Sequence, residues 1–219
     1  MKHLFRVGAA LCFLAAPLSA QVFESYSSSG RSHWEITPTV GGYFGSDIYA
    51  ATGAYLHASD SWSYGGRVAY YPHSQFGLEV GYMYAQSDIS STKLIGGTTK
   101  YGTLNLQQID FNGNFEGGSK KVTGYFTIGL GMTIVDPKLN TQFNANPASS
   151  TKFAFNTGLG FKVWMGDRMG LRVDGRLRTI DTNRTTSQGV WCDYYGYCWY
   201  YASTWYNSGE VTGGIVLRF

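Results

Sequence analysis

The segment 171–179 alternates between charged and apolar residues, and this alternation constrains the fold more than any other feature of the chain. A period of two residues places successive side chains on opposite faces of a β-strand. A slip of this strand by one residue would exchange its two faces. All its charged side chains therefore face the same environment, whichever side of the sheet that is. The two faces carry Arg172, Asp174, Arg176 and Arg178 against Leu171, Val173 and Leu177.

The same period recurs along the chain, and no helical periodicity follows residue 20. Leu104 and Leu106 are exceptions, because they stand on a face that is otherwise polar. They predict a β-bulge between themselves and the regular part of their strand. Strands are expected over 33–44, 63–72, 76–86, 103–115, 122–134, 153–165, 171–179 and 207–219.

The connections between these segments alternate in length. No run after residue 20 approaches the ~18 apolar residues that a transmembrane helix needs. Short turns on one side and long loops on the other are typical of bacterial outer-membrane barrels. We therefore expect an all-β fold, an eight-stranded antiparallel up-and-down transmembrane β-barrel. The short connections are 72–75, 116–121 and 166–170, and the long ones are 45–62, 87–102, 135–152 and 180–206.

The glycines of the polar face indicate that this face is the barrel interior. A narrow interior favours small residues because they make room for large neighbours, whereas a water-facing surface gives no such reason. An Arg turned toward lipid near the membrane centre would also cost roughly 2–4 kcal/mol. The glycines stand at positions 41, 77, 81, 129, 131, 158, 160 and 214.

Charged residues on the same face predict a network of ion pairs inside the barrel. Buried charges must be paired and hydrogen-bonded, and the six basic and five acidic residues are close to balance. Glu79 and Arg67 stand on neighbouring strands and are expected to form one of the pairs. The predicted network is Glu35, Arg67, Glu79, Asp110, Lys162, Arg172, Asp174, Arg176, Arg178, Glu210 and Arg218.

Three alternatives share much of this pattern. A soluble, periplasmic, lipocalin-like carrier has the same strand period with the two faces reversed. A narrow pore is less expected, because eight strands leave an interior that side chains just fill. A lipid-modifying barrel enzyme is disfavoured, because His57 with Ser59 and Asp60 stands in a loop, and His73 stands in a short turn. We predict no catalytic residues, no metal site and no cofactor.

The N-terminus has the organisation of a secretory signal peptide. Lys2 and Arg6 precede an apolar run over 7–16, and Ala20 marks the expected cleavage site. We therefore expect a signal peptide over 1–20, a flexible periplasmic lead-in over 21–32, and export to the outer membrane. The formal net charge of only +3 shows no basic stripe, so no nucleic-acid partner is expected.

The last long connection is the best candidate for recognition of a partner. Cys192 and Cys198 are predicted to form a disulfide, since an exported chain meets an oxidising compartment. Rigid aromatic rings offer contact area at low entropic cost, so this loop is expected to bind a glycan, lipopolysaccharide or protein. Equally, the rings could extend the outer aromatic girdle or cover the barrel mouth. The candidate residues are Trp191, Tyr194, Tyr195, Tyr197, Trp199, Tyr200 and Tyr201.

Short motifs resemble the outer-membrane β-barrel domain family, which includes the OmpA membrane domain, OmpX and opacity-type surface proteins. The resemblance covers 33–219 and implies contact with outer-membrane lipid, insertion by the barrel-assembly machinery and usually no catalysis. Phe219 resembles the C-terminal assembly signal of this family. The motifs are Glu35-Ile36-Thr37-Pro38, Gly66-Arg67-Val68-Ala69-Tyr70, Gly77-Leu78-Glu79-Val80-Gly81-Tyr82, Gly124-Tyr125-Phe126-Thr127 and Gly213-Gly214-Ile215-Val216-Leu217-Arg218-Phe219.

Overall fold

The computed structural model describes residues 32–45, 47–49, 55–92, 98–139, 149–181, 191–192, 198–199 and 205–219. No helix in these ranges is long and apolar enough to cross a membrane. The strands are β1 (His33–Phe44), β2 (Asp47–Tyr49), β3 (Tyr55–Ala58), β4 (Ser61–His73), β5 (Phe76–Thr92), β6 (Thr98–Gly118), β7 (Val122–Leu139), β8 (Ser150–Trp164), β9 (Met169–Asp181), β10 (Trp191–Cys192), β11 (Cys198–Trp199) and β12 (Trp205–Arg218).

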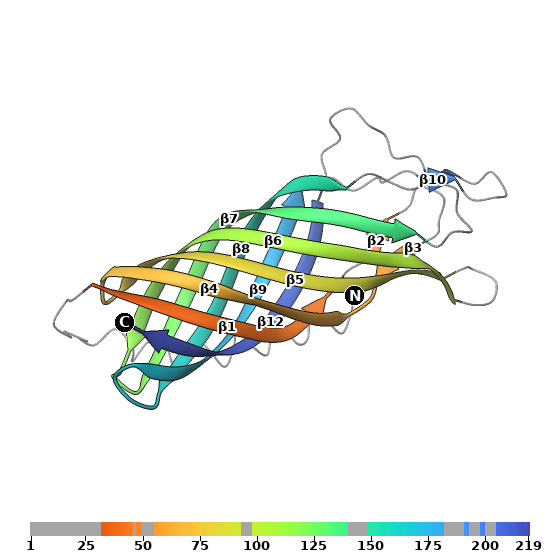
Figure 1. Cartoon of the computed structure of the whole chain (residues 1–219). Coiled ribbons are helices and arrows are strands. Elements are labelled where there is room, and N and C mark those ends of the chain that lie inside the picture. The colour runs from red at the N-terminus through yellow and green to blue at the C-terminus, as the bar shows by residue number, and fades with distance from the viewer. Residues whose placement is uncertain are drawn as a thin grey trace.

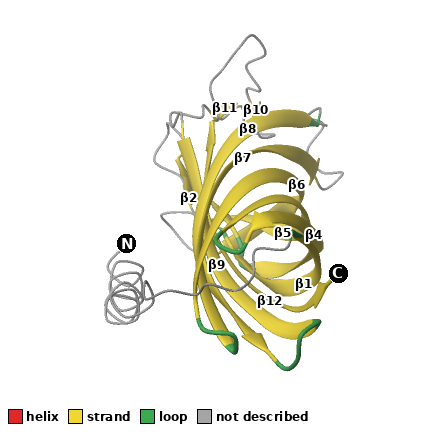
Figure 2. Ribbon diagram, turned by 90° about the vertical axis from the view of Figure 1, so that its left-hand side faces the viewer, coloured by secondary structure: helices red, strands yellow, loops and turns green. Residues whose placement is uncertain are grey.

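Eight long strands close into a barrel (Figure 1). Each pairs antiparallel with its neighbours in the order β1, β4, β5, β6, β7, β8, β9 and β12, and β12 returns to β1. The seam between the first and last strands is extended by two backbone hydrogen bonds between Trp34 and Phe219, at 3.1 and 2.9 Å. Figure 2 shows the curved strands enclosing a central space. The expected up-and-down barrel is confirmed.

The strands continue well into the long connections, beyond the ends expected from the sequence. β5, β6 and β7 reach Thr92, Thr98 and Leu139. β3 pairs with the far end of β5, and β2 pairs with β3, so both add to the sheet beyond the outer end of β4. One side of the barrel is therefore taller than the other at the end opposite the short turns (Figure 1).

The expected β-bulge before Gln108 is wrong. Leu104, Leu106 and Gln108 pair in unbroken register with Ser87, Ala85 and Met83 of β5. The register shifts instead between Ile89 and Ser90, closer to the end of the strand. Leu104 and Leu106 point inward like the polar residues that follow them, because the interior becomes apolar toward this end.

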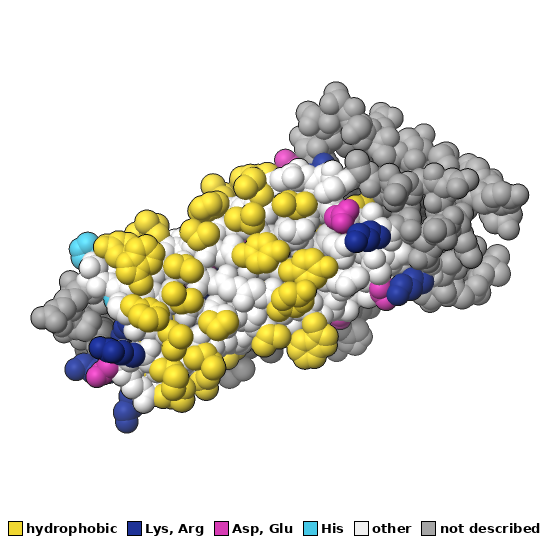
Figure 3. Space-filling model, in the orientation of Figure 1, with side chains coloured by type: hydrophobic (Ala, Val, Ile, Leu, Met, Phe, Trp, Pro, Cys, Tyr) yellow, Lys and Arg dark blue, Asp and Glu magenta, His cyan; other side chains and the backbone are white. Residues whose placement is uncertain are grey.

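Large apolar side chains cover the outside of the barrel. Leu177 is 67% exposed and Leu130 is 52% exposed, although both lie within regular strands. Figure 3 shows this apolar belt along the barrel wall, with charged side chains gathered toward its two ends. A contiguous apolar surface of this kind is stable in lipid and not in water. The lipocalin-like alternative, which needs a polar exterior, is therefore wrong.

Aromatic pairs mark both borders of the apolar belt. Near the short turns, the ring of Trp34 lies 4.9 Å from that of Tyr70. Near the other end, the rings of Tyr64 and Tyr84 lie 5.2 Å apart. The Tyr84 hydroxyl donates a hydrogen bond of 3.1 Å to the Asn105 side chain. Rings with one polar edge are stable where hydrocarbon meets headgroups, so these pairs correspond to the two interfaces.

The side-chain orientation in β7 leads to a first prediction. Replacement of Leu130 by Arg, midway along the strand and facing outward, should lower the free energy of unfolding by roughly 2–4 kcal/mol in a bilayer. Trp62→Arg, near the outer end of β4, should cost only about 0–1 kcal/mol, since the headgroup region solvates the charge. Urea unfolding of the refolded protein in lipid vesicles measures both. Equal costs at the two positions would contradict this placement of the membrane.

Candidate functional site

The centre of the lumen is held by carboxylates that each bind two or more guanidinium groups. Glu79 of β5 accepts hydrogen bonds of 2.7 Å from both Arg172 and Arg176 of β9. Asp174 accepts one of 2.8 Å from Arg176 and one of 2.6 Å from Arg67 of β4. These side chains are at most 4% exposed. The network thus joins three strands across the lumen.

A second cluster closes the end near the short turns. The Lys162 ammonium of β8 is fully buried and binds Glu35 of β1 and Glu116 of β6. It also donates a hydrogen bond of 3.0 Å to the Tyr71 hydroxyl. Arg218 donates one of 3.2 Å to Glu35 and lies over the Trp164 ring. Residues far apart in the sequence therefore seal this end of the barrel together.

A third group lies toward the outer end of the network. Arg178 of β9 binds Asp110 of β6, and its other terminal nitrogen lies 3.7 Å from Glu210 of β12. Glu210 also accepts a hydrogen bond of 3.4 Å from Arg67. Arg67 therefore links this group to the central one, and the ion pairs run along most of the lumen.

All eleven predicted network residues face the lumen, and Arg218 alone among them is substantially exposed, at 31% of its side chain. The expected pairing of Glu79 with Arg67 is wrong. Arg67 forms ion pairs with Asp174 and Glu210, while Glu79 forms ion pairs with the arginines of β9. In a narrow lumen, a long side chain can meet a strand opposite as easily as its neighbour.

Glu116 and Tyr71 were missed as members of the network. Glu116 was assigned to a turn, yet β6 continues to Gly118, and its side chain is only 4% exposed. With it, the described network holds six cations and six carboxylates. The period of two could have found both residues, because Glu116 follows Asp110, Asn112 and Asn114 on one face.

The glycines of the lumen wall admit the side chains of neighbouring strands. A Cβ added at Gly131 of β7 would lie 2.3 Å from Oδ1 of Asp110, and one at Gly160 would lie 2.5 Å from the Tyr125 ring. Such contacts are shorter than packed atoms allow. The Tyr125 hydroxyl in turn accepts a hydrogen bond of 2.7 Å from Arg172. The expected role in making room for neighbouring side chains is confirmed for five of the eight glycines, whereas a Cβ at Gly41 or Gly214 would meet backbone well before a side chain and one at Gly81 would make only ordinary contacts. The five are Gly77, Gly129, Gly131, Gly158 and Gly160.

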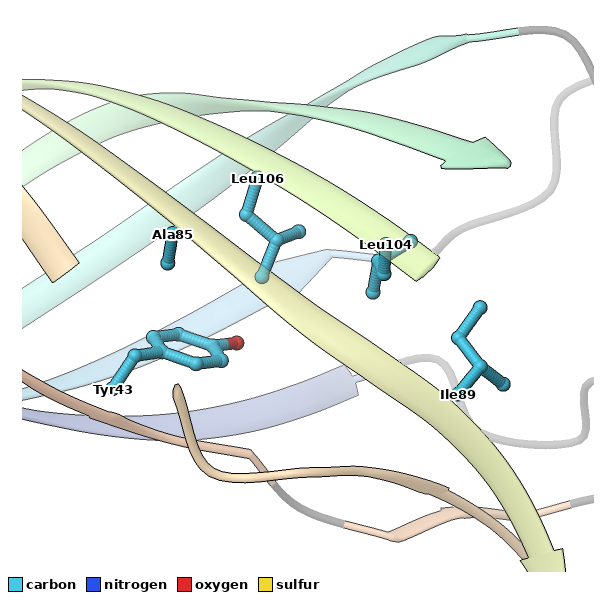
Figure 4. Close-up of a cluster of buried hydrophobic side chains, with 5 residues drawn as sticks. All are labelled: Tyr43, Ala85, Ile89, Leu104 and Leu106. Carbon is cyan, nitrogen blue, oxygen red and sulfur yellow. The ribbon is translucent and has the colours of Figure 1, made fainter. Parts of the chain in front are cut away.

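Above the charge network, the lumen becomes apolar. Tyr43 of β1, Ala85 and Ile89 of β5, and Leu104 and Leu106 of β6 form a buried cluster, with Val135 packed against it. Figure 4 shows the side chains of the five cluster residues inside the barrel wall. Charge and apolarity therefore separate along the axis of the lumen.

Within the charge network and beside it, several buried polar side chains keep at least one atom without a protein partner. Among the described residues, nine buried polar side-chain atoms on β6, β7 and β8 lack a hydrogen bond. At about 1–3 kcal/mol for each unsatisfied group, their summed cost would equal or exceed the whole stability of a typical domain, about 5–15 kcal/mol. The residues concerned are Gln108, Asp110, Asn112, Asn114, Thr127, Thr133 and Asn156.

Part of the aromatic candidate loop forms a short hairpin. β10 and β11 pair antiparallel, with Trp191 opposite Trp199 and Cys192 opposite Cys198. Directly opposed residues in such a ladder have Cα atoms about 4.5–5.5 Å apart, within the range a disulfide spans. The structure shows this register and not the bond, so the disulfide remains a prediction. Tyr194, Tyr195, Tyr197, Tyr200 and Tyr201 lie outside the described residues, as do residues 1–31.

The described residues contain no group of three or more His, Cys, Asp or Glu side chains arranged to hold a metal ion. What they do contain is a closed antiparallel barrel with charges inside and an apolar belt outside. These features define a transmembrane β-barrel of the bacterial outer membrane.

The chain belongs to the outer membrane protein β-barrel domain family, whose model matches residues 8–219. Its fold is similar to that of the outer membrane protein OprG from Pseudomonas aeruginosa, with a TM-score of 0.61, 11% identity, and coverage of 87% of this chain and 97% of that one. Neisserial surface protein A is similar with a TM-score of 0.54, 12% identity, and coverage of 86% and 99%. No curated protein sequence gives a significant match.

The shared carboxylate leads to a second prediction. Glu79→Gln removes the charge that pairs Arg172 and Arg176, and should destabilise the barrel by about 3–5 kcal/mol because both buried cations lose one carboxylate and are left to share Asp174. Asp88→Asn is a matched control, since its pair with Lys100 is about half exposed and should contribute about 0–1 kcal/mol. The midpoint of urea unfolding in lipid vesicles reports both.

A double variant distinguishes lost pairing from altered packing. Glu79→Gln combined with Arg176→Gln removes one charge of each sign, and should recover part of the stability lost in the single variant. A double variant as unstable as the sum of both single changes would show that Glu79 and Arg176 act independently, against the paired geometry.

Proposed function

We propose that this protein is a non-catalytic surface-recognition barrel, in which the outer-membrane domain presents long extracellular loops to a ligand. The observation that carries the proposal is the β10–β11 ladder, which pairs Trp191 with Trp199 inside a loop rich in Tyr and Trp. The register brings two of the loop's aromatic residues to opposed backbone positions. Rigid aromatic residues of this kind recur as anchors of binding surfaces.

The ligand class that suits this loop is an extracellular glycan, lipopolysaccharide or a protein. Between Trp191 and Tyr206, Asp193 is the one charged residue among nine aromatic ones. Stacking on sugar faces or apolar protein patches therefore suits this segment better than ion pairing with a polyanion. The rival role, in which the rings extend the outer girdle, predicts no ligand at all.

Export and assembly complete the proposal. The N-terminal segment is removed near Ala20, and the barrel-assembly machinery recognises the C-terminal strand ending in Phe219. The Phe219 side chain is 70% exposed on the apolar face of the barrel, where an assembly factor could reach it before insertion. Outer-membrane lipid then covers the belt.

The recognition role predicts a loss of binding on truncation of two rings. A ligand is first found with the unmodified protein on a glycan array or on lipopolysaccharide-coated plates. Cells carrying Trp199→Ala with Tyr195→Ala should then lose ~2 kcal/mol of the free energy of binding this ligand. Trp62→Ala serves as control, because Trp62 is 78% exposed on β4 and outside the loop. Undiminished binding by the double variant would assign the rings to the girdle instead.

The disulfide predicts a redox dependence of the same binding. Cys192→Ser with Cys198→Ser should weaken ligand binding, since the disulfide pre-orders the loop. The barrel itself should stay folded, which is seen as a change of electrophoretic mobility when the sample is boiled. A reducing agent should weaken binding by the unmodified protein and leave the double variant unaffected. Alkylation of both thiols in the exported protein without prior reduction would disprove the disulfide.

A further inference from the structure

The inward face of β6 changes character once along its length. From Gln108 to Glu116 every inward residue is polar, whereas Leu104 and Leu106 before them are apolar and buried. Oxygens without a protein partner recur at four successive inward positions, two residues apart. The four residues are Gln108, Asp110, Asn112 and Asn114.

The neighbouring strands line the same strip of the lumen wall. Thr133 and Thr127 of β7 pair with Gln108 and Asn114, and each buries a hydroxyl without a partner. Asn156 of β8 is fully buried and has no partner for either amide atom. Nine of the sixteen unpartnered side-chain atoms of the described residues therefore form a strip over three adjacent strands, and the other seven lie on β1, β4, β9 and β12.

Protein atoms alone cannot satisfy this strip. Gln108 is 1% exposed, and both its amide oxygen and its amide nitrogen lack a partner. A buried primary amide needs both donors and acceptors from its surroundings. Water supplies both in one small molecule, and buried water typically serves such otherwise unsatisfied groups.

We infer that a column of ordered water runs along the inward face of β6 from Asn114 to Gln108, and that the apolar cluster above it seals the column from the outside. Leu106 and Leu104 follow Gln108 toward the outer end at the next two inward positions. Apolar constrictions of this kind exclude water and so act as gates in membrane proteins. The lumen is then a hydrated chamber with a stopper, and its ligand is water or a neutral solute of similar size.

The seal is continued by residues from other strands. Tyr43 of β1 is 1% exposed and donates or accepts a hydrogen bond of 3.2 Å with the Tyr206 hydroxyl of β12. Ala85 lies directly opposite Leu106 on β5, and Val135 lies opposite it on β7. The stopper is therefore built by residues of β1, β5, β6 and β7 near the outer end of the barrel, and five of its side chains are drawn in Figure 4.

The water column is tested by magnetic resonance on the refolded full chain in nanodiscs. The Gln108 side-chain amide should show cross-peaks with water that persist when a soluble paramagnetic chelate is added, because the bound water is internal. Gln107 is a matched control, since it is the adjacent Gln, faces outward and bonds to the Tyr82 hydroxyl. Absence of a water cross-peak at Gln108 would overturn the column.

The stopper is tested by thiol accessibility in a background with Cys12→Ser, Cys192→Ser and Cys198→Ser, which removes all three native thiols. Cysteine placed by Gln108→Cys should react slowly with a small charged methanethiosulfonate. Leu104→Ala with Leu106→Ala should raise the rate by roughly tenfold or more, equivalent to lowering the barrier to entry by about 1.4 kcal/mol. Leu177→Ala, the same change on the outward face, should leave the rate unchanged.

Two results would overturn the stopper. If the introduced thiol reacts fast with the methanethiosulfonate while Leu104 and Leu106 are unchanged, the lumen is open. A rate that stays low after both leucines are truncated would show that they do not control entry. Should Gln108→Cys fail to give the boiling-dependent gel shift of a folded barrel, Asn156→Cys probes the same chamber from β8.

Discussion

The pairing of buried guanidinium groups with buried carboxylates is the interaction on which the rest of the structure depends. An unpaired charge at these positions would cost about 3–5 kcal/mol, a large share of the stability of a typical domain. Glu79 and Asp174 each serve more than one arginine, so the network has to form as a unit. The strand register must bring these groups together, and the glycines must leave them room.

The outer surface follows from the same arrangement. Because charged, polar and small residues occupy one face of each long strand, the other face is left to the apolar residues, and eight strands present them on a continuous belt. Only lipid makes such a belt favourable. The interior then grades from ion pairs near the short turns to an apolar cluster near the long connections, which gives the two ends of the barrel different properties.

Sequence periodicity predicted the strands, their faces and all eleven original network residues, but not how those residues pair. Glu79 and Arg67 stand on neighbouring strands, yet each bonds across the lumen. Leu104 and Leu106 suggested a bulge because a polar interior was assumed throughout. The expected turn over 116–121 includes Glu116, because the alternation of residues does not locate the end of β6. Each error concerns a contact or a boundary that depends on strands distant in the sequence.

The sequence by itself determined the strand period, the face each residue occupies and the near-balance of charge on one face, because all three depend on residue order alone. The tertiary structure decided which charges pair, where the lumen turns apolar and which polar groups stay without protein partners. These three features depend on closure of the barrel, because closure fixes how far each strand is shifted along the axis relative to the strand across the lumen. The register that places Cys192 opposite Cys198 also came from the fold, because spacing alone does not specify a ladder.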